Sequence, residues 1–111
     1  MSIASEDRLI DDLEIRDTSG HTSGGSENRG FIPKTIVVHN HLDKQVSVQL
    51  QGDVESGFSN PITIGAPIVV GDGDDEYATL TDYFPFFRVV ATCSVTPTSG
   101  DVSVILAKVG A

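Results

Sequence analysis

The sequence has one cysteine, no tryptophan, few basic residues and no long apolar run, and each absence excludes a class of protein. Cys93 alone forms no intrachain disulfide and builds no multi-thiolate zinc site. Against 16 acidic residues there are 7 basic ones, scattered, and the net charge of -9 disfavours nucleic acid and anionic membranes as partners. No run of 18 apolar residues and no export signal is recognisable. We therefore expect a soluble protein with no nucleic-acid or membrane partner.

The acidity has two interpretations, and composition leaves both open. One is ordinary solubility of a small domain, and the other is adaptation to a salt-rich medium, where self-repulsion is screened. The halophilic interpretation is supported by the excess of Asp over Lys.

Catalytic motifs are also absent. The chain contains no G-x-S-x-G, no H-E-x-x-H, no phosphate-binding G-x-x-x-x-G-K, and no glycine fingerprint between a strand and a helix. Gly71-Asp72-Gly73 matches only the first letters of such a fingerprint. We expect no enzyme, no catalytic residue and no cofactor.

Residues 1–30 differ in composition from the remainder. They consist of an acidic piece with a few apolar positions, followed by a stretch rich in Ser, Gly, Thr and Asn. This composition is typical of a polar arm and linker, and a solvated tail, a short amphipathic helix and a strand laid on a neighbour all remain open. We expect an arm at 1–30 that packs against a neighbouring subunit, and a separate β-domain at 31–111.

After Pro33 the pattern becomes that of short strands. Strand-like segments occur at 35–41, 45–51, 61–70, 76–81, 86–94 and 101–108, separated by turn signals every 8 to 12 residues. The first two are expected to form a hairpin with one apolar face, and Gly65-Ala66-Pro67 predicts a bulge or an edge strand. Val46, Val48 and Leu50 share one face of a strand, as do Val102, Val104 and Leu106. The fold class is all-β, a small β-sandwich of six to seven strands, jelly-roll-like or Ig-like, with an extended N-terminal arm.

Two groups of side chains are candidates for binding a cation. His39 and His41 would project from one strand face, with Asp43 as a third ligand to a transition metal. The other group is the acidic turn Asp72, Asp74, Asp75 and Glu76, whose oxygens suit calcium although the spacing is not that of an EF-hand. The expected roles are a polar strand end and a solvated turn, so we predict no metal ligands.

The remaining candidates are aromatic residues and the single thiol. Tyr77, Tyr83, Phe84, Phe86 and Phe87 surround Pro85 and are expected to fill the core at a corner, any exposed member marking a protein interface. Cys93 is expected to be a buried, unreactive small residue.

Three passages carry a resemblance to a known group of proteins: "VHNHLDKQVSVQLQG", "GDGDDEYATLTDYFPFFRV" and "TPTSGDVSVILAK". Residues 37–108, which contain them, resemble the small β-sandwich virion structural proteins of tailed viruses, both bacteriophages and haloarchaeal viruses. The resemblance is one of general character and assigns no functional residue. It implies a non-enzymatic, capsid-associated protein of the decoration, stabilising or turret type.

Several consequences follow from that resemblance. The protein would be a homo-oligomer in the virion, assembled in the host cytoplasm, with the major capsid protein or tail components as partners. One alternative is a tail, neck or baseplate component. Another is a cellular carbohydrate- or ligand-binding module, which would present exposed aromatic residues on one face.

Overall fold

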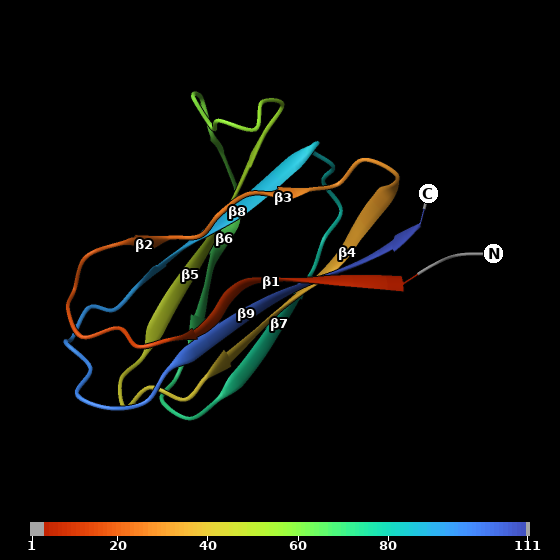
Figure 1. The fold of residues 1–111 in the computed structure, drawn as a ribbon. Helices are drawn as coiled ribbons and strands as arrows, with labels where there is room; N and C mark the ends of the chain where they lie inside the picture. Colours follow the sequence, from red (N-terminus) through yellow and green to blue (C-terminus); the bar gives the residue numbers. More distant parts are fainter. Residues whose placement is uncertain (1–3, 111) are drawn as a thin grey trace.

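The computed structural model describes residues 4–110, which form nine strands in two antiparallel sheets and no helix (Figure 1). The strands are β1 (Ala4–Leu13), β2 (His21–Thr22), β3 (Ser26–Glu27), β4 (Phe31–Asn40), β5 (Val46–Asp53), β6 (Ile62–Val70), β7 (Asp75–Thr79), β8 (Phe86–Thr92) and β9 (Val102–Gly110). Within the range 4–110, no helix is long and apolar enough to cross a membrane.

The strand order identifies the fold. One sheet has the order β1-β9-β4-β7 and the other has the order β2-β8-β5-β6, with β3 also paired to β8. The short strands β2 and β3 lie end to end along one edge of β8, so they act as one interrupted strand (Figure 1). When β2 and β3 are counted as one strand, each sheet has four strands, and strands from the N-terminal half of the chain lie beside strands from the C-terminal half. This order is the double Greek key of a jelly roll. The predicted β-sandwich is confirmed, and its jelly-roll form is specified.

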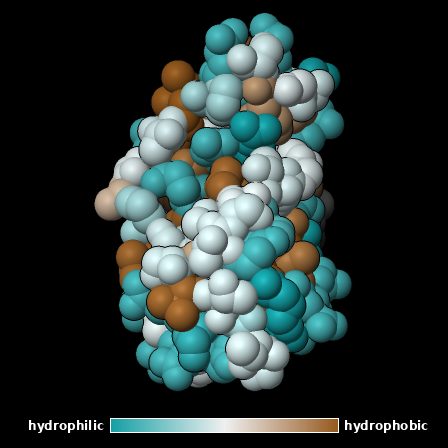
Figure 2. Space-filling view, turned by 90° about the vertical axis from the view of Figure 1, so that its left-hand side faces the viewer, coloured by the Kyte–Doolittle hydropathy of each residue, from teal (hydrophilic) through white to brown (hydrophobic). Residues whose placement is uncertain are grey.

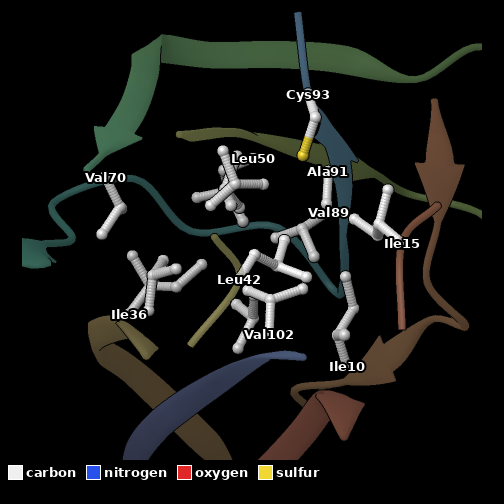
Figure 3. Close-up of a cluster of buried hydrophobic side chains, with 14 of the residues drawn as sticks. Ile10, Ile15, Ile36, Leu42, Leu50, Val70, Val89, Ala91, Cys93 and Val102 are labelled. Carbon is white, nitrogen blue, oxygen red and sulfur yellow. The ribbon is translucent and has the colours of Figure 1, made fainter. Parts of the chain in front are cut away.

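Alternation along the strands produces the core. Val46, Val48 and Leu50 on β5 point inward, as the alternation predicts, while the intervening polar residues are half-buried on the outer face. Val104 is fully buried on β9, between β1 and β4. Figure 3 shows this cluster of aliphatic side chains between the sheets. All six predicted strand segments are present, each with shifts of a few residues at its ends.

The predicted hairpin of residues 35–41 and 45–51 is wrong. β4 pairs with β7 and β9, whereas β5 lies in the other sheet and pairs with β6 and β8. Residues 41–45 span about 16 Å when extended, which is enough to cross the roughly 10 Å between packed sheets. Leu42 in this link is buried in the core, so the turn signal is a crossover between the sheets.

The predicted irregularity in β6 is confirmed in both of its forms. β6 is an edge strand, and its pairing with β5 shifts between Val48 and Leu50, where Gly65 has φ +66°. The Gln49 amide donates to the carbonyl oxygens of Ile64 at 3.1 Å and Leu50 at 3.0 Å. The bulge is therefore held by a side chain from the neighbouring strand.

The N-terminal segment is placed differently from the sequence expectation. Residues 4–27 supply β1, β2 and β3, and Ile10 and Ile15 belong to the core, where they lie in the same cluster as Val89 and Ala91 (Figure 3). Residues 4–30 are thus an integral part of the jelly roll and not an arm outside it. Within the chain, β1 pairs with β9. Residues 1–3 lie outside the described residues.

Candidate functional site

The two histidines of the candidate metal group lie beside different carboxylates. His39 Nδ1 lies 2.8 Å from Asp75 Oδ1 on the neighbouring strand β7, and His41 Nδ1 lies 3.8 Å from Asp101 Oδ1. Asp43 is used elsewhere, because its carboxylate accepts hydrogen bonds from the Thr98 hydroxyl and the Thr98 amide, the latter at 2.9 Å. These bonds lower the pKa of Asp43 from 3.8 to about 2. Asp43 therefore links the connection between β4 and β5 to the loop between β8 and β9.

The acidic turn is organised by its backbone. The Asp74 amide donates to the Gly71 carbonyl at 3.1 Å, and Gly73 has φ +73°, a conformation that favours glycine. The Asp74 carbonyl accepts from the Asn40 amide at 3.0 Å, which fixes the turn against β4. Among residues 4–110, no three His, Cys, Asp or Glu side chains are grouped as metal ligands would be.

A buried polar cluster that the sequence pattern did not indicate lies where β1, β3 and β9 meet. The Lys108 side chain is only 4% exposed, and its Nζ is 2.8 Å from Asp7 Oδ2. It also donates to the Glu27 carbonyl at 2.7 Å and to Ser26 Oγ at 3.2 Å, with Asn28 Oδ1 at 3.4 Å. Three good acceptors satisfy an ammonium group fully, so the cluster fixes the N-terminal strands to β9.

Cys93 and the aromatic residues fall into buried and exposed groups. Cys93 is buried, and its sulfur points into the aliphatic cluster of Figure 3; burial raises the pKa of the thiol. Phe84 and Phe87 make an edge-to-face pair with ring centroids 6.1 Å apart. Tyr77 on β7 and Tyr83 before β8 are 69% and 54% exposed, so the expected core-filling role is wrong for these two residues.

A cleft of about 260 Å³ with a largely aliphatic lining lies between β6 and β7, the edge strands of opposite sheets. Ile64, Ile68, Ala78 and Leu80 form its partly buried walls, and Ile36 and Leu50 of the core form its floor. The mouth includes exposed Ala66 and, near one end, Asp82. Sequence reasoning missed this cleft because it lies between strands of different sheets.

The two open sides of the sandwich, one between the edge strands β6 and β7 and the other between the edge strands β1 and β2, differ in how the gap between the sheets is filled. On the side away from β6 and β7, the connection after β1 carries fully buried Ile15 into the core and closes the gap between the sheets. On the face shown in Figure 2, apolar residues are separate patches among hydrophilic ones. The β6–β7 cleft is therefore the candidate interaction site.

Comparisons with known proteins identify the fold but no family. No protein-family model matches the chain, and no curated protein matches its sequence. Among solved structures, the PBSX exported protein XepA superposes with a TM-score of 0.72 at 13% identity, over 96% of this chain and 37% of XepA. PirA superposes with a TM-score of 0.58 at 12% identity, over 96% of this chain and 92% of PirA.

A viral structure is among the matches. A chain of the infectious bursal disease virus Gx strain superposes with a TM-score of 0.52 at 11% identity, over 97% of this chain and 32% of that chain. This protein thus spans nearly all of PirA but about a third of XepA and of the viral chain. At such low identities the likeness shows a shared fold, which occurs in a virus structure and in a PBSX protein.

Proposed function

We propose that the protein is a non-enzymatic structural component of a tailed-virus particle, bound to the capsid as a decoration, stabilising or turret protein. The observation that supports the proposal is the jelly-roll fold of this chain, on which XepA and the infectious bursal disease virus chain superpose with TM-scores of 0.72 and 0.52. The resemblance of residues 37–108 to small virion proteins points the same way. On this proposal the protein resides in the virion after assembly in the host cytoplasm.

The side chains of the domain support a role based on surfaces. The Lys108 ammonium, the Asn40 amide and the Asp43 carboxylate all serve hydrogen bonds that hold strands and loops in place. The features left for partners are the β6–β7 cleft and the exposed apolar residues, among them Tyr77 and Val69. We propose that other virion proteins, and further copies of this chain, bind through such sandwich surfaces.

The location of the protein tests the proposal directly. Particles from cells that carry the gene are banded on a density gradient, and the protein is quantified by mass spectrometry relative to the major capsid protein. The expected result is a fixed ratio across the particle band. An abundant host protein, followed in the same fractions, controls for co-sedimentation.

Native mass spectrometry of the purified protein provides the second measurement. We expect an oligomer or a complex with a virion protein. A protein absent from particles, strictly monomeric and bound to a sugar would overturn the proposal in favour of the carbohydrate-binding alternative. Tyr77 and Tyr83 are the exposed aromatic residues that this alternative would use, and the Tyr83 hydroxyl already donates a hydrogen bond to the Asn28 carbonyl at 3.3 Å.

A further inference from the structure

We propose that the β6–β7 cleft is a docking site for an extended, basic segment of a partner protein, which adds a strand to the free edge of β7. This inference rests on the proposed function, because it specifies the chemistry of the virion partner. It is supported by the backbone of the two edge strands and by the distribution of charge around them.

The backbone favours an added strand on β7. Within residues 4–110, β7 pairs only with β4, so its other edge presents unpaired backbone groups beside the cleft. The opposite wall cannot be extended in the same way, because β6 carries the bulge at Gly65 and because Pro67 has no N–H to donate. A strand added to β7 would extend that sheet alongside β6 and cover the cleft mouth.

The cleft dimensions agree with this occupant. Its volume of about 260 Å³ is below the roughly 300–1,000 Å³ of pockets that enclose small ligands. Most of its lining is aliphatic, including Ile64, Ile68 and Leu80, and the polar members are Thr79, Thr81 and Asp82. Side chains at alternate positions of an added strand project to one face, so apolar ones would enter the cleft while the backbone pairs with β7.

The local charge selects a basic partner. The lining of the cleft contains Asp82 and no Lys or Arg, and residues 56–87, which include β6 and β7, carry five acidic side chains and no basic one. The nearest base along the sheet is Lys34 on β4, whose carbonyl accepts a hydrogen bond from the Leu80 amide at 2.8 Å. Asp82 lies at one end of the cleft, and the acidic turn of residues 72–76 precedes β7. A second copy of this chain would bring the same carboxylates and a net charge of -9 to the contact, so it is disfavoured as the occupant.

A pair of designed peptides tests this inference on the full-length protein. The probe is the peptide KKVTVTVTKK, and its matched control is EEVTVTVTEE, which has the same strand-forming centre and the opposite charge. Binding is followed by ¹H–¹⁵N NMR titration and by calorimetry. We expect the lysine peptide to bind about tenfold or more tightly than the glutamate peptide, and its affinity to fall as salt is raised from about 0.05 M to 0.5 M.

The position of binding is tested with two variants. Ala66→Lys places a long cationic side chain at the cleft mouth, and Val95→Lys makes the same change at an exposed residue outside the cleft. Thermal melts verify that both variants fold. We expect Ala66→Lys to weaken binding of the lysine peptide about tenfold or more, Val95→Lys to leave it unchanged, and the NMR shifts to concentrate on β6 and β7.

Several results would overturn the inference. They are equal binding of both peptides, no binding of either, shifts away from β6 and β7, or a self-association that Ala66→Lys abolishes, which would make a second copy the occupant. Failure of the proposed function is distinguishable, because peptide binding at the cleft is measured independently of whether the protein is found in particles.

Discussion

The buried ammonium of Lys108 provides the most demanding test of how the N-terminal strands are held. Replacing Lys108 with Met keeps the aliphatic volume but removes the group that joins β9 to Asp7, Ser26 and the Glu27 carbonyl. Breaking a buried ion pair by removing one partner costs about 3–5 kcal/mol. Asp7 is 40% exposed and regains water, which lowers that figure. The buried Ser26 hydroxyl and the Glu27 carbonyl lose a donor, which adds about 1–3 kcal/mol each when no water replaces it.

Together these contributions lead us to expect a loss of at least about 3 kcal/mol in the free energy of unfolding. For a domain of this size, about 3 kcal/mol corresponds to a fall in Tm of about 13 °C. Urea titrations followed by circular dichroism measure the loss. The matched control is Lys34→Met, an exposed lysine on β4, which should change stability by less than about 0.5 kcal/mol.

The same variant has a pH signature. Desolvation raises the pKa of Asp7, but hydrogen bonds from Lys108 and Ser26 outweigh it and lower the pKa below 3.8. A depressed folded pKa stabilises the protein above the unfolded pKa, and this contribution is lost as pH falls from about 4 through the lowered value. Lys108→Met should therefore reduce the difference in stability between pH 7 and pH 3. A variant as stable as the wild type at pH 7 would refute the assigned role of Lys108.

Three further predictions concern the strands and their links. Deleting residues 1–15 should abolish the folded state, which would be seen as a loss of dispersed NMR amide signals; a folded truncation would contradict the placement of β1 in the core. The single substitution Ile15→Ala should lower the free energy of unfolding by about 3 kcal/mol in urea titrations. Asn40→Ala removes a buried amide that donates to Val70 and Gly71 carbonyls, and should cost about 2–4 kcal/mol by calorimetry, with exposed Asn60→Ala near neutral. Gly100→Ala should cost more than about 2 kcal/mol, since φ is +86° and a Cβ would lie 1.9 Å from the His41 carbonyl oxygen; an unchanged Tm would show that the loop adapts.

The strands after residue 33 were predictable because alternation is a local property of a strand with one buried face. β5 shows it most clearly, with Val46, Val48 and Leu50 inward. β1 lacks such a signal. Its sequence ASEDRLIDDL forms an edge strand in which Ile10 is the one buried hydrophobic residue among residues 5–13, and a sequence this polar is equally compatible with a solvated tail. β1 is also irregular: Asp12 has φ +49°, and two register shifts interrupt the pairing of β1 with β9.

The cleft and the polar cluster were not predictable from local patterns. Lys108 ends an apolar strand segment, where a lysine is ordinarily solvated, and its partner Asp7 is about a hundred residues away in sequence. The cleft lies between β6 and β7. The acidic residues between these strands predict a turn, but no local pattern shows that the two strands belong to different sheets. The turn at residues 42–44 was misassigned for the same reason, since a short polar link serves a hairpin and a crossover between sheets equally.

The sequence by itself determined an all-β chain, the position of six strands, the face that each of the most regular strands buries, and the bulge in β6. These follow from period-two alternation and from the backbone restrictions of Gly and Pro, which act over a few residues. Only the tertiary structure decided which strands share a sheet, that residues 4–27 complete the jelly roll, and that Lys108 is enclosed beside Asp7. Those features depend on pairings between distant segments, whose energies come from the burial and hydrogen bonds that form when the two sheets close on each other.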